Sequence, residues 1–85
     1  METINLEKSN YYQETFINGE LSETERGLKD DRFKDNVLDK QSIDFFKRLG
    51  GKETIKQGSK FGYGCTIHTS ISPDKSTKII RYFFY

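Results

Sequence analysis

Hydrophobic and polar positions alternate most regularly in the last third of the chain. Between residues 62 and 71 the odd positions are mostly apolar and the even positions small or polar, which is the period of a half-buried strand. Residues 77–85 are apolar enough for a second strand. In the segment 72–76 between them, Pro73 presets φ and Asp74 can bond its own backbone, as in a tight turn. The pattern predicts an antiparallel β-hairpin over residues 61–85.

The middle of the chain has the spacing of a helix. Ile43, Phe46 and Leu49 recur every three residues and form one apolar face. Asp39 suits the N-cap position, and the glycine pair that begins at Gly50 suits the C-terminal end. We therefore expect a helix over residues 39–49.

The N-terminal part has weaker signals. A short strand over 12–17 is expected before the turn signal Asn18-Gly19. Ser22 and Glu25 fit a capping box, which predicts a helix from Glu23 onward, although Gly27 would weaken it by about 1 kcal/mol relative to Ala. A partly mobile segment is the alternative. Residues 1–20 are expected to be extended or mobile.

These elements predict the α+β class. With Thr54–Gln57 as a further short strand, the simplest architecture is one or two short helices packed on a small antiparallel sheet of three strands, ending in a C-terminal β-hairpin. The 85 residues make one small domain, residues 1–85. Leu, Ile, Val and Phe number 21, enough for a thin core.

The cysteine and histidine content limits both metal sites and disulfides. Cys65 is the only cysteine and His68 the only histidine, so an internal disulfide is impossible and structural zinc, which needs about four such ligands, is not expected. No cofactor is expected. Residues 1–10 carry charges and no apolar stretch of the signal-peptide kind. We expect a cytoplasmic protein.

No residue constellation predicts catalysis. Cys65 and His68 lie three apart in a predicted strand, so their side chains should point to opposite faces and cannot pair as thiolate and imidazolium. Cys65 is expected to be buried and His68 to face solvent. Asp30, Asp31 and Asp35 interleave with basic residues, which is typical of a solvated helix face rather than a metal site. A non-enzymatic protein is predicted.

The charge distribution changes this picture more than any motif does. Residues 1–45 carry 11 acids and 6 bases, a net charge of −5, whereas residues 46–85 carry 2 acids and 8 bases, a net charge of +6. Such asymmetry indicates partners and association rather than a fold. The two halves could also pair with each other within the molecule.

The leading prediction is a small binding protein that regulates or inhibits a partner protein by surface contact. Small proteins of phages and mobile elements that block a host nuclease, those of the anti-CRISPR type among them, have this general profile. The partner would then be a nucleic-acid-binding enzyme whose basic groove receives an acidic face. That face is predicted to consist of Glu20, Glu23, Glu25, Asp30, Asp31 and Asp35.

The first alternative is nucleic-acid binding by the basic, aromatic hairpin. In Gly62-Tyr63-Gly64 the chain resembles the RNP strand of RNA-binding sheets, but Cys65 stands where that motif has an aromatic residue, and the chain has no βαββαβ pattern. No family is assigned on this basis. The predicted nucleic-acid surface consists of Lys52, Lys56, Lys60, Tyr63, Lys75, Lys78, Arg81 and Tyr82.

The second alternative is a structural or assembly subunit. The end of the chain, Phe83, Phe84 and Tyr85, is apolar on both faces of the predicted strand, and exposed apolar strands invite pairing. These three residues would form an interface with a neighbouring sheet, for example in a homodimer. The competing interpretation is that N-terminal residues cover them, such as Tyr11, Tyr12, Phe16 and Ile17.

Overall fold

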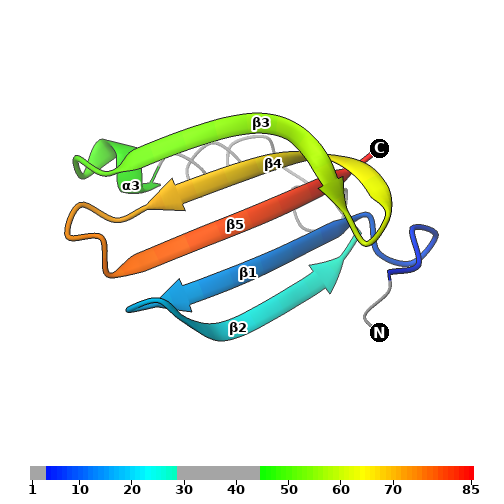
Figure 1. Cartoon of the computed structure of the whole chain (residues 1–85), viewed down its shortest axis with the longest axis horizontal. Helices are drawn as coiled ribbons and strands as arrows, with labels where there is room; N and C mark the ends of the chain where they lie inside the picture. The colour runs from blue at the N-terminus through cyan, green and yellow to red at the C-terminus, as the bar shows by residue number, and fades with distance from the viewer. Residues whose placement is uncertain (1–3, 29–44) are drawn as a thin grey trace.

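The computed structural model describes residues 4–28 and 45–85 and contains a five-stranded antiparallel sheet with one very short helix (Figure 1). The strand order across the sheet is β2-β1-β5-β4-β3. In the described part of the chain, no helix is long and apolar enough to cross a membrane. The elements are β1 (Tyr11–Ile17), β2 (Glu20–Gly27), α3 (Phe45–Arg48), β3 (Lys52–Lys60), β4 (Tyr63–Ile71) and β5 (Thr77–Phe84).

Within residues 4–28 and 45–85 the fold is essentially all-β rather than the predicted α+β, and the sheet has five strands rather than three. The helix expected from Glu23 is instead strand β2, in which Glu25 lies opposite Gln13 of β1. Ser22 is the extra residue of a β-bulge. Capping signals are local and worth about 1 kcal/mol, and pairing along the whole of β1 overrides them.

The predicted helix over 39–49 overlaps α3, and its first part, residues 39–44, lies outside the described residues. Its end at Gly50 is confirmed. The Gly51 N–H donates to the Phe46 carbonyl over 2.7 Å and the Gly50 N–H to the Lys47 carbonyl over 3.1 Å, which is the Schellman arrangement. Gly50 has a φ of 98°, a conformation that glycine adopts without steric cost.

Two tight turns have positive φ at both central residues. Asn18 and Gly19, at 53° and 83°, join β1 to β2 as predicted, and Phe61 and Gly62, at 55° and 83°, join β3 to β4. Such turns match the twist of the strands they connect. A bulky residue at positive φ is unusual, and the Phe61 ring lies against Tyr12, with 5.1 Å between the ring centroids. This packing offsets the backbone strain.

The predicted C-terminal hairpin is present, with β4 and β5 joined by the turn over 72–76. Asp74 Oδ1 accepts hydrogen bonds from the Ser76 N–H at 3.0 Å and from the hydroxyls of Ser72 and Ser76 at 2.7 Å each. These bonds favour the ionised carboxylate and lower the pKa of Asp74 to about 2.

The strand that ends the hairpin, β5, lies at the centre of the sheet between β1 and β4. Phe84 is buried, and Phe83 packs on Tyr11 with 5.2 Å between ring centroids. Tyr85 is 77% exposed. The N-terminal residue Tyr11 thus contacts Phe83 from the neighbouring strand β1 rather than from a layer above the sheet. Because β5 pairs on both sides, residues 77–84 offer no open strand edge for a neighbouring sheet.

The hydrophobic core of the described residues lies on one face of the sheet, whereas Tyr11, which is also buried, lies on the other face. The segment before β1, where extended or mobile chain was expected, contributes Ile4 to this core, with Leu6 packed beside it. The buried core residues are Ile4, Tyr12, Cys65, Ile67, Tyr82 and Phe84.

Candidate functional site

Strand register assigns the charged side chains to the two faces of the sheet. Lys56 lies opposite Ile67, Ile67 opposite Tyr82, and Tyr82 opposite Tyr12, so all four share the face that holds the core. We call it the basic face because of the bases that its strands carry: Arg26, Lys52, Lys56, Lys60 and Lys78.

Most of the predicted nucleic-acid surface lies on the basic face. Lys75, in the 72–76 turn, lies beside the same face with Lys52 and Lys78. Arg81 does not belong to this surface, because it lies opposite His68 and faces the other way. Tyr82 is buried and cannot stack on a ligand, whereas Tyr63 is 44% exposed.

Among the described residues, the acid on the strands of the basic face is Glu14. Its carboxylate accepts the Tyr82 hydroxyl at 3.1 Å and the Tyr12 hydroxyl at 3.4 Å, and Lys60 Nζ lies 4.0 Å away. Burial, and then the charge and hydrogen bond of Glu14, raise the pKa of Tyr82. Glu14 is thus held by groups of the core and offsets little charge elsewhere on the face.

The remaining lysines of the face keep their charge unpaired. Lys52, Lys56, Lys75 and Lys78 are exposed, and in the described part of the chain no carboxylate pairs with them. Four unneutralised ammonium groups at one face favour the approach of an anion.

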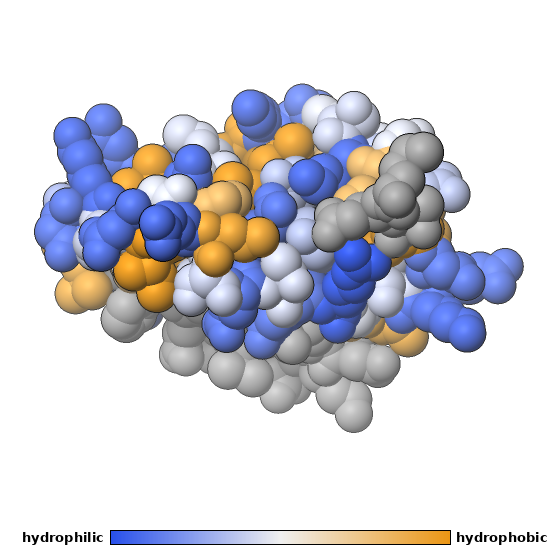
Figure 2. Space-filling model, turned by 60° about the horizontal axis from the view of Figure 1, so that its bottom comes forward, coloured by the Kyte–Doolittle hydropathy of each residue, from blue (hydrophilic) through white to orange (hydrophobic). Residues whose placement is uncertain are grey.

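Cations also lie over aromatic rings on the basic face. The Arg26 guanidinium carbon is 5.1 Å from the centroid of Tyr12 and 5.5 Å from that of Phe61. Lys78 Nζ lies 5.3 Å from the centroid of Phe16. Such distances allow cation–π attraction. Figure 2, in which the lower side of Figure 1 is turned toward the viewer, shows hydrophobic and hydrophilic residues interspersed on that side of the molecule.

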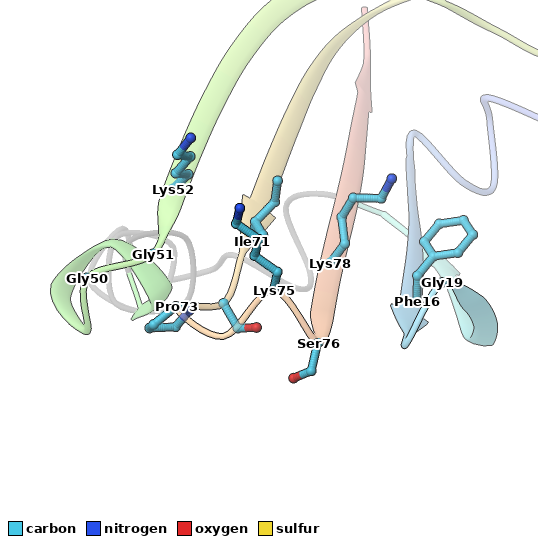
Figure 3. Close-up of a pocket in the computed structure, with 11 residues that line it drawn as sticks. Phe16, Gly19, Gly50, Gly51, Lys52, Ile71, Pro73, Lys75, Ser76 and Lys78 are labelled. Atoms are coloured by element: carbon cyan, nitrogen blue, oxygen red, sulfur yellow. The ribbon is translucent and has the colours of Figure 1, made fainter.

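A hollow of about 560 Å³ opens at one end of the basic face (Figure 3). Three lysines from three segments line it: Lys52 of β3, Lys75 of the turn and Lys78 of β5. Phe16 of β1 lines it as well, and Gly50-Gly51 brings the end of α3 to its wall. None of the described residues that line it is acidic. The size is typical of small-molecule sites.

The opposite face buries polar side chains instead. Arg81 is 4% exposed, and its Nη1 donates to the Ser70 hydroxyl over 3.1 Å. His68, expected to face solvent, is 3% exposed. Cys65 lies on the other face from His68, as predicted, and burial raises the pKa of the Cys65 thiol despite the nearby charge of Lys60. The two residues therefore form no nucleophilic pair.

The described part of the predicted acidic face lies on β2. Glu20, Glu23 and Glu25 pair with Ile17, Thr15 and Gln13, so they point away from the basic face. Asp30, Asp31 and Asp35 lie outside the described residues. The charge difference between the two halves of the sequence thus becomes, for the described strands, a difference between two faces of one sheet.

Three residues of the basic face were missed by sequence reasoning. Arg26 was assigned to a helix, and Phe16 and Phe61 were not considered as site residues. The spacing of Lys52, Lys56 and Lys60 groups those three lysines, because residues four apart in a strand share a face. It gives no signal for Arg26 and Phe16, which join the face through the pairing of β1 with β2 and β5. Within residues 4–28 and 45–85, no group of three or more His, Cys, Asp or Glu could hold a metal ion.

Comparison of the chain with protein-family models, with curated proteins and with solved structures finds no match in any of the three.

Proposed function

We propose that the protein is a small binding protein that holds single-stranded nucleic acid on its basic face. The observation that supports this most strongly concerns Lys52, Lys56, Lys75 and Lys78, which lie on or beside one face: within residues 4–28 and 45–85 no carboxylate pairs with them. Phosphate contacts by lysine supply most of the affinity in non-specific nucleic-acid binding.

Single strands fit this face better than a duplex does. The basic face is a sheet surface with aromatic rings, and unpaired bases stack on such rings whereas duplex bases are already stacked. Tyr63 exposes part of its ring, and Phe16 and Phe61 are half-buried. Lys52, Lys56 and Lys60 follow β3 at intervals of about 13 Å, given a rise of about 3.3 Å per residue, so they would track a backbone.

The proposal is tested by fluorescence anisotropy with a labelled single-stranded oligonucleotide over a series of salt concentrations. The triple variant Lys52→Gln, Lys56→Gln, Lys78→Gln removes three phosphate contacts. The slope of log K against log salt should then become less steep by about 2, since each contact contributes about 0.7 for single strands.

A charge-matched control is the triple variant Lys8→Gln, Lys47→Gln, Arg48→Gln. These bases are exposed but lie outside the strands of the basic face, so the slope should stay close to that of the wild type. Absence of binding by the wild-type protein at low salt, or equal slopes for the two variants, would contradict the proposal.

A second candidate function is regulation of a basic protein partner through β2. Glu20 and Glu23 are exposed on an edge strand and, with Glu25, point to one side. Such a surface complements a nucleic-acid-binding groove. The variant Glu20→Gln, Glu23→Gln, Glu25→Gln should slow association with such a partner, most strongly at low salt. Capture of the same lysate proteins by the wild type and this variant would remove the candidate.

A further inference from the structure

The lining of the hollow at the end of the basic face favours a narrower class of anion than the face as a whole does. Lys52, Lys75 and Lys78 line it from three chain segments, and none of the described residues that line it is acidic (Figure 3). Three acids directly adjoin lining residues in the chain: Glu20, Glu53 and Asp74. Glu20 and Glu53 lie at strand positions that face away from the basic face, and Asp74 has its Oδ1 engaged by Ser72 and Ser76. The hollow therefore has walls on several sides, and the side chains that line it carry a net positive charge.

Three lysines along one hollow favour a phosphomonoester over a phosphodiester. A terminal phosphate carries about −1.5 to −2 charge at pH 7 because its second pKa is near 6, whereas each internal phosphate of a strand carries one negative charge. Lysine binds phosphate as a point charge without fixed geometry, so a cluster of three discriminates mainly by the charge of the ligand.

The position of the hollow also fits the end of a strand. The lysines of β3 run from Lys60 towards Lys52, where the turn over 72–76 and Gly50-Gly51 form the walls of the hollow. Phe16 lies at its far side (Figure 3). Its half-buried ring is available to a base next to a bound phosphate.

We propose that this hollow binds the terminal phosphate of a nucleic-acid strand, with Lys52, Lys75 and Lys78 around the phosphate and Phe16 against the terminal base. This proposal rests on the proposed function, since it assigns the hollow as the site for the end of the strand that the basic face would hold.

The test compares three otherwise identical labelled oligonucleotides that carry a 5′-phosphate, a 3′-phosphate or hydroxyls at both ends. The wild-type protein should bind one phosphorylated form about tenfold more tightly than the hydroxyl form, because it gains charge-assisted contacts. Which phosphorylated form is preferred shows the direction of the strand. Equal affinity for all three would overturn the proposal and leave the proposed function standing.

Two double variants test whether the hollow is responsible for the preference for a phosphorylated end. Lys52→Gln with Lys75→Gln should abolish the preference for a phosphorylated end while the hydroxyl form still binds. Lys47→Gln with Lys56→Gln removes the same charge outside the hollow and should keep the preference. A preference that survives in the first variant would contradict the proposed site.

The hollow can also be probed without a strand. Titration of the wild-type protein with a nucleoside monophosphate should shift amide NMR signals of residues 50–52 and 72–78, and Phe16→Leu should weaken this binding more than binding of inorganic phosphate. If no oligonucleotide binds, the proposed function fails. If in addition these amide signals do not move, the hollow is not a phosphate site.

Discussion

The two faces of the sheet bury different kinds of side chain, although the same strands form both. On the basic face, apolar residues fill the centre and lysines remain exposed around it. On the opposite face, the positions across from one another in β4 and β5 include the buried His68 and Arg81. Lys78 and Arg81, three residues apart in β5, thus have different roles, one in contact with solvent and one structural. Net charge counted along the sequence hides this distinction, which strand alternation makes clear.

The largest effect on stability should come from the core of the basic face. Phe84→Ala removes a ring that is 3% exposed and packs against Phe61, with 6.3 Å between the ring centroids. We expect a loss of about 4 kcal/mol in the free energy of unfolding. Urea denaturation measures it. Tyr85→Ala, at a residue that is 77% exposed, should cost about 0.5 kcal/mol or less. Similar losses for both variants would contradict the described core.

The next largest effect separates the two faces directly. Arg81→Ala leaves the buried Ser70 hydroxyl without its 3.1 Å donor and opens space around it, so we expect a loss of about 3 kcal/mol. Lys78→Ala in the same strand should change stability by about 0.5 kcal/mol or less. Oligonucleotide affinity, measured where both variants are folded, should fall for Lys78→Ala and stay near wild type for Arg81→Ala. The reverse result would place Arg81 in the site.

A smaller effect is expected from the hydroxyl that binds Glu14. Tyr82→Phe removes the 3.1 Å hydrogen bond and should cost about 1.5 kcal/mol, because the acceptor is a carboxylate. The folded pKa of Tyr82 is raised, so its contribution is fully present below the unfolded pKa of about 10 and is lost as pH rises above it. Denaturation at pH 7 and pH 11 should show the difference between variant and wild type shrinking. A constant difference would argue against this coupling.

The smallest effect concerns the turn that borders the hollow. The pKa of Asp74 is lowered from 3.8 to about 2, so its stabilisation is present above pH 3.8 and is lost as pH falls towards 2. Asp74→Asn keeps an acceptor oxygen but removes the charge. The wild type should be slightly more stable than the variant at pH 7, and the two should converge near pH 2 in acid titrations followed by circular dichroism. Curves that stay parallel would contradict the shifted pKa.

Local signals in the sequence predicted the parts of the fold that depend on a few adjacent residues. Asn18-Gly19, Gly50 and the turn around Asp74 were all identified, because backbone conformation and short-range hydrogen bonds determine them. Strand β2 was missed because its partner, β1, and not its own composition, determines its conformation.

The candidate site could be predicted from the sequence only in part, again because long-range strand pairing determines much of it. Alternation correctly separates Cys65 from His68, and it also groups the lysines of β3. It cannot show that β1 pairs with β5 and so brings Phe16 opposite Lys78, because that contact spans most of the chain. The hollow, which needs four strands and a turn in register, has no local signature.

The central position of β5 has a consequence for how the molecule is made. β5 pairs with β1, from which its partners are separated by 60 to 72 residues, and with β4. The two hairpins β1–β2 and β3–β4 therefore cannot join into one sheet until β5 has been synthesised. Until then both hairpins present unpaired edges, and long-range pairing of this kind folds slowly. A nascent chain should therefore be most prone to aggregation in the interval between the synthesis of β3–β4 and that of β5, and slow translation of residues 77–84 should lengthen this interval.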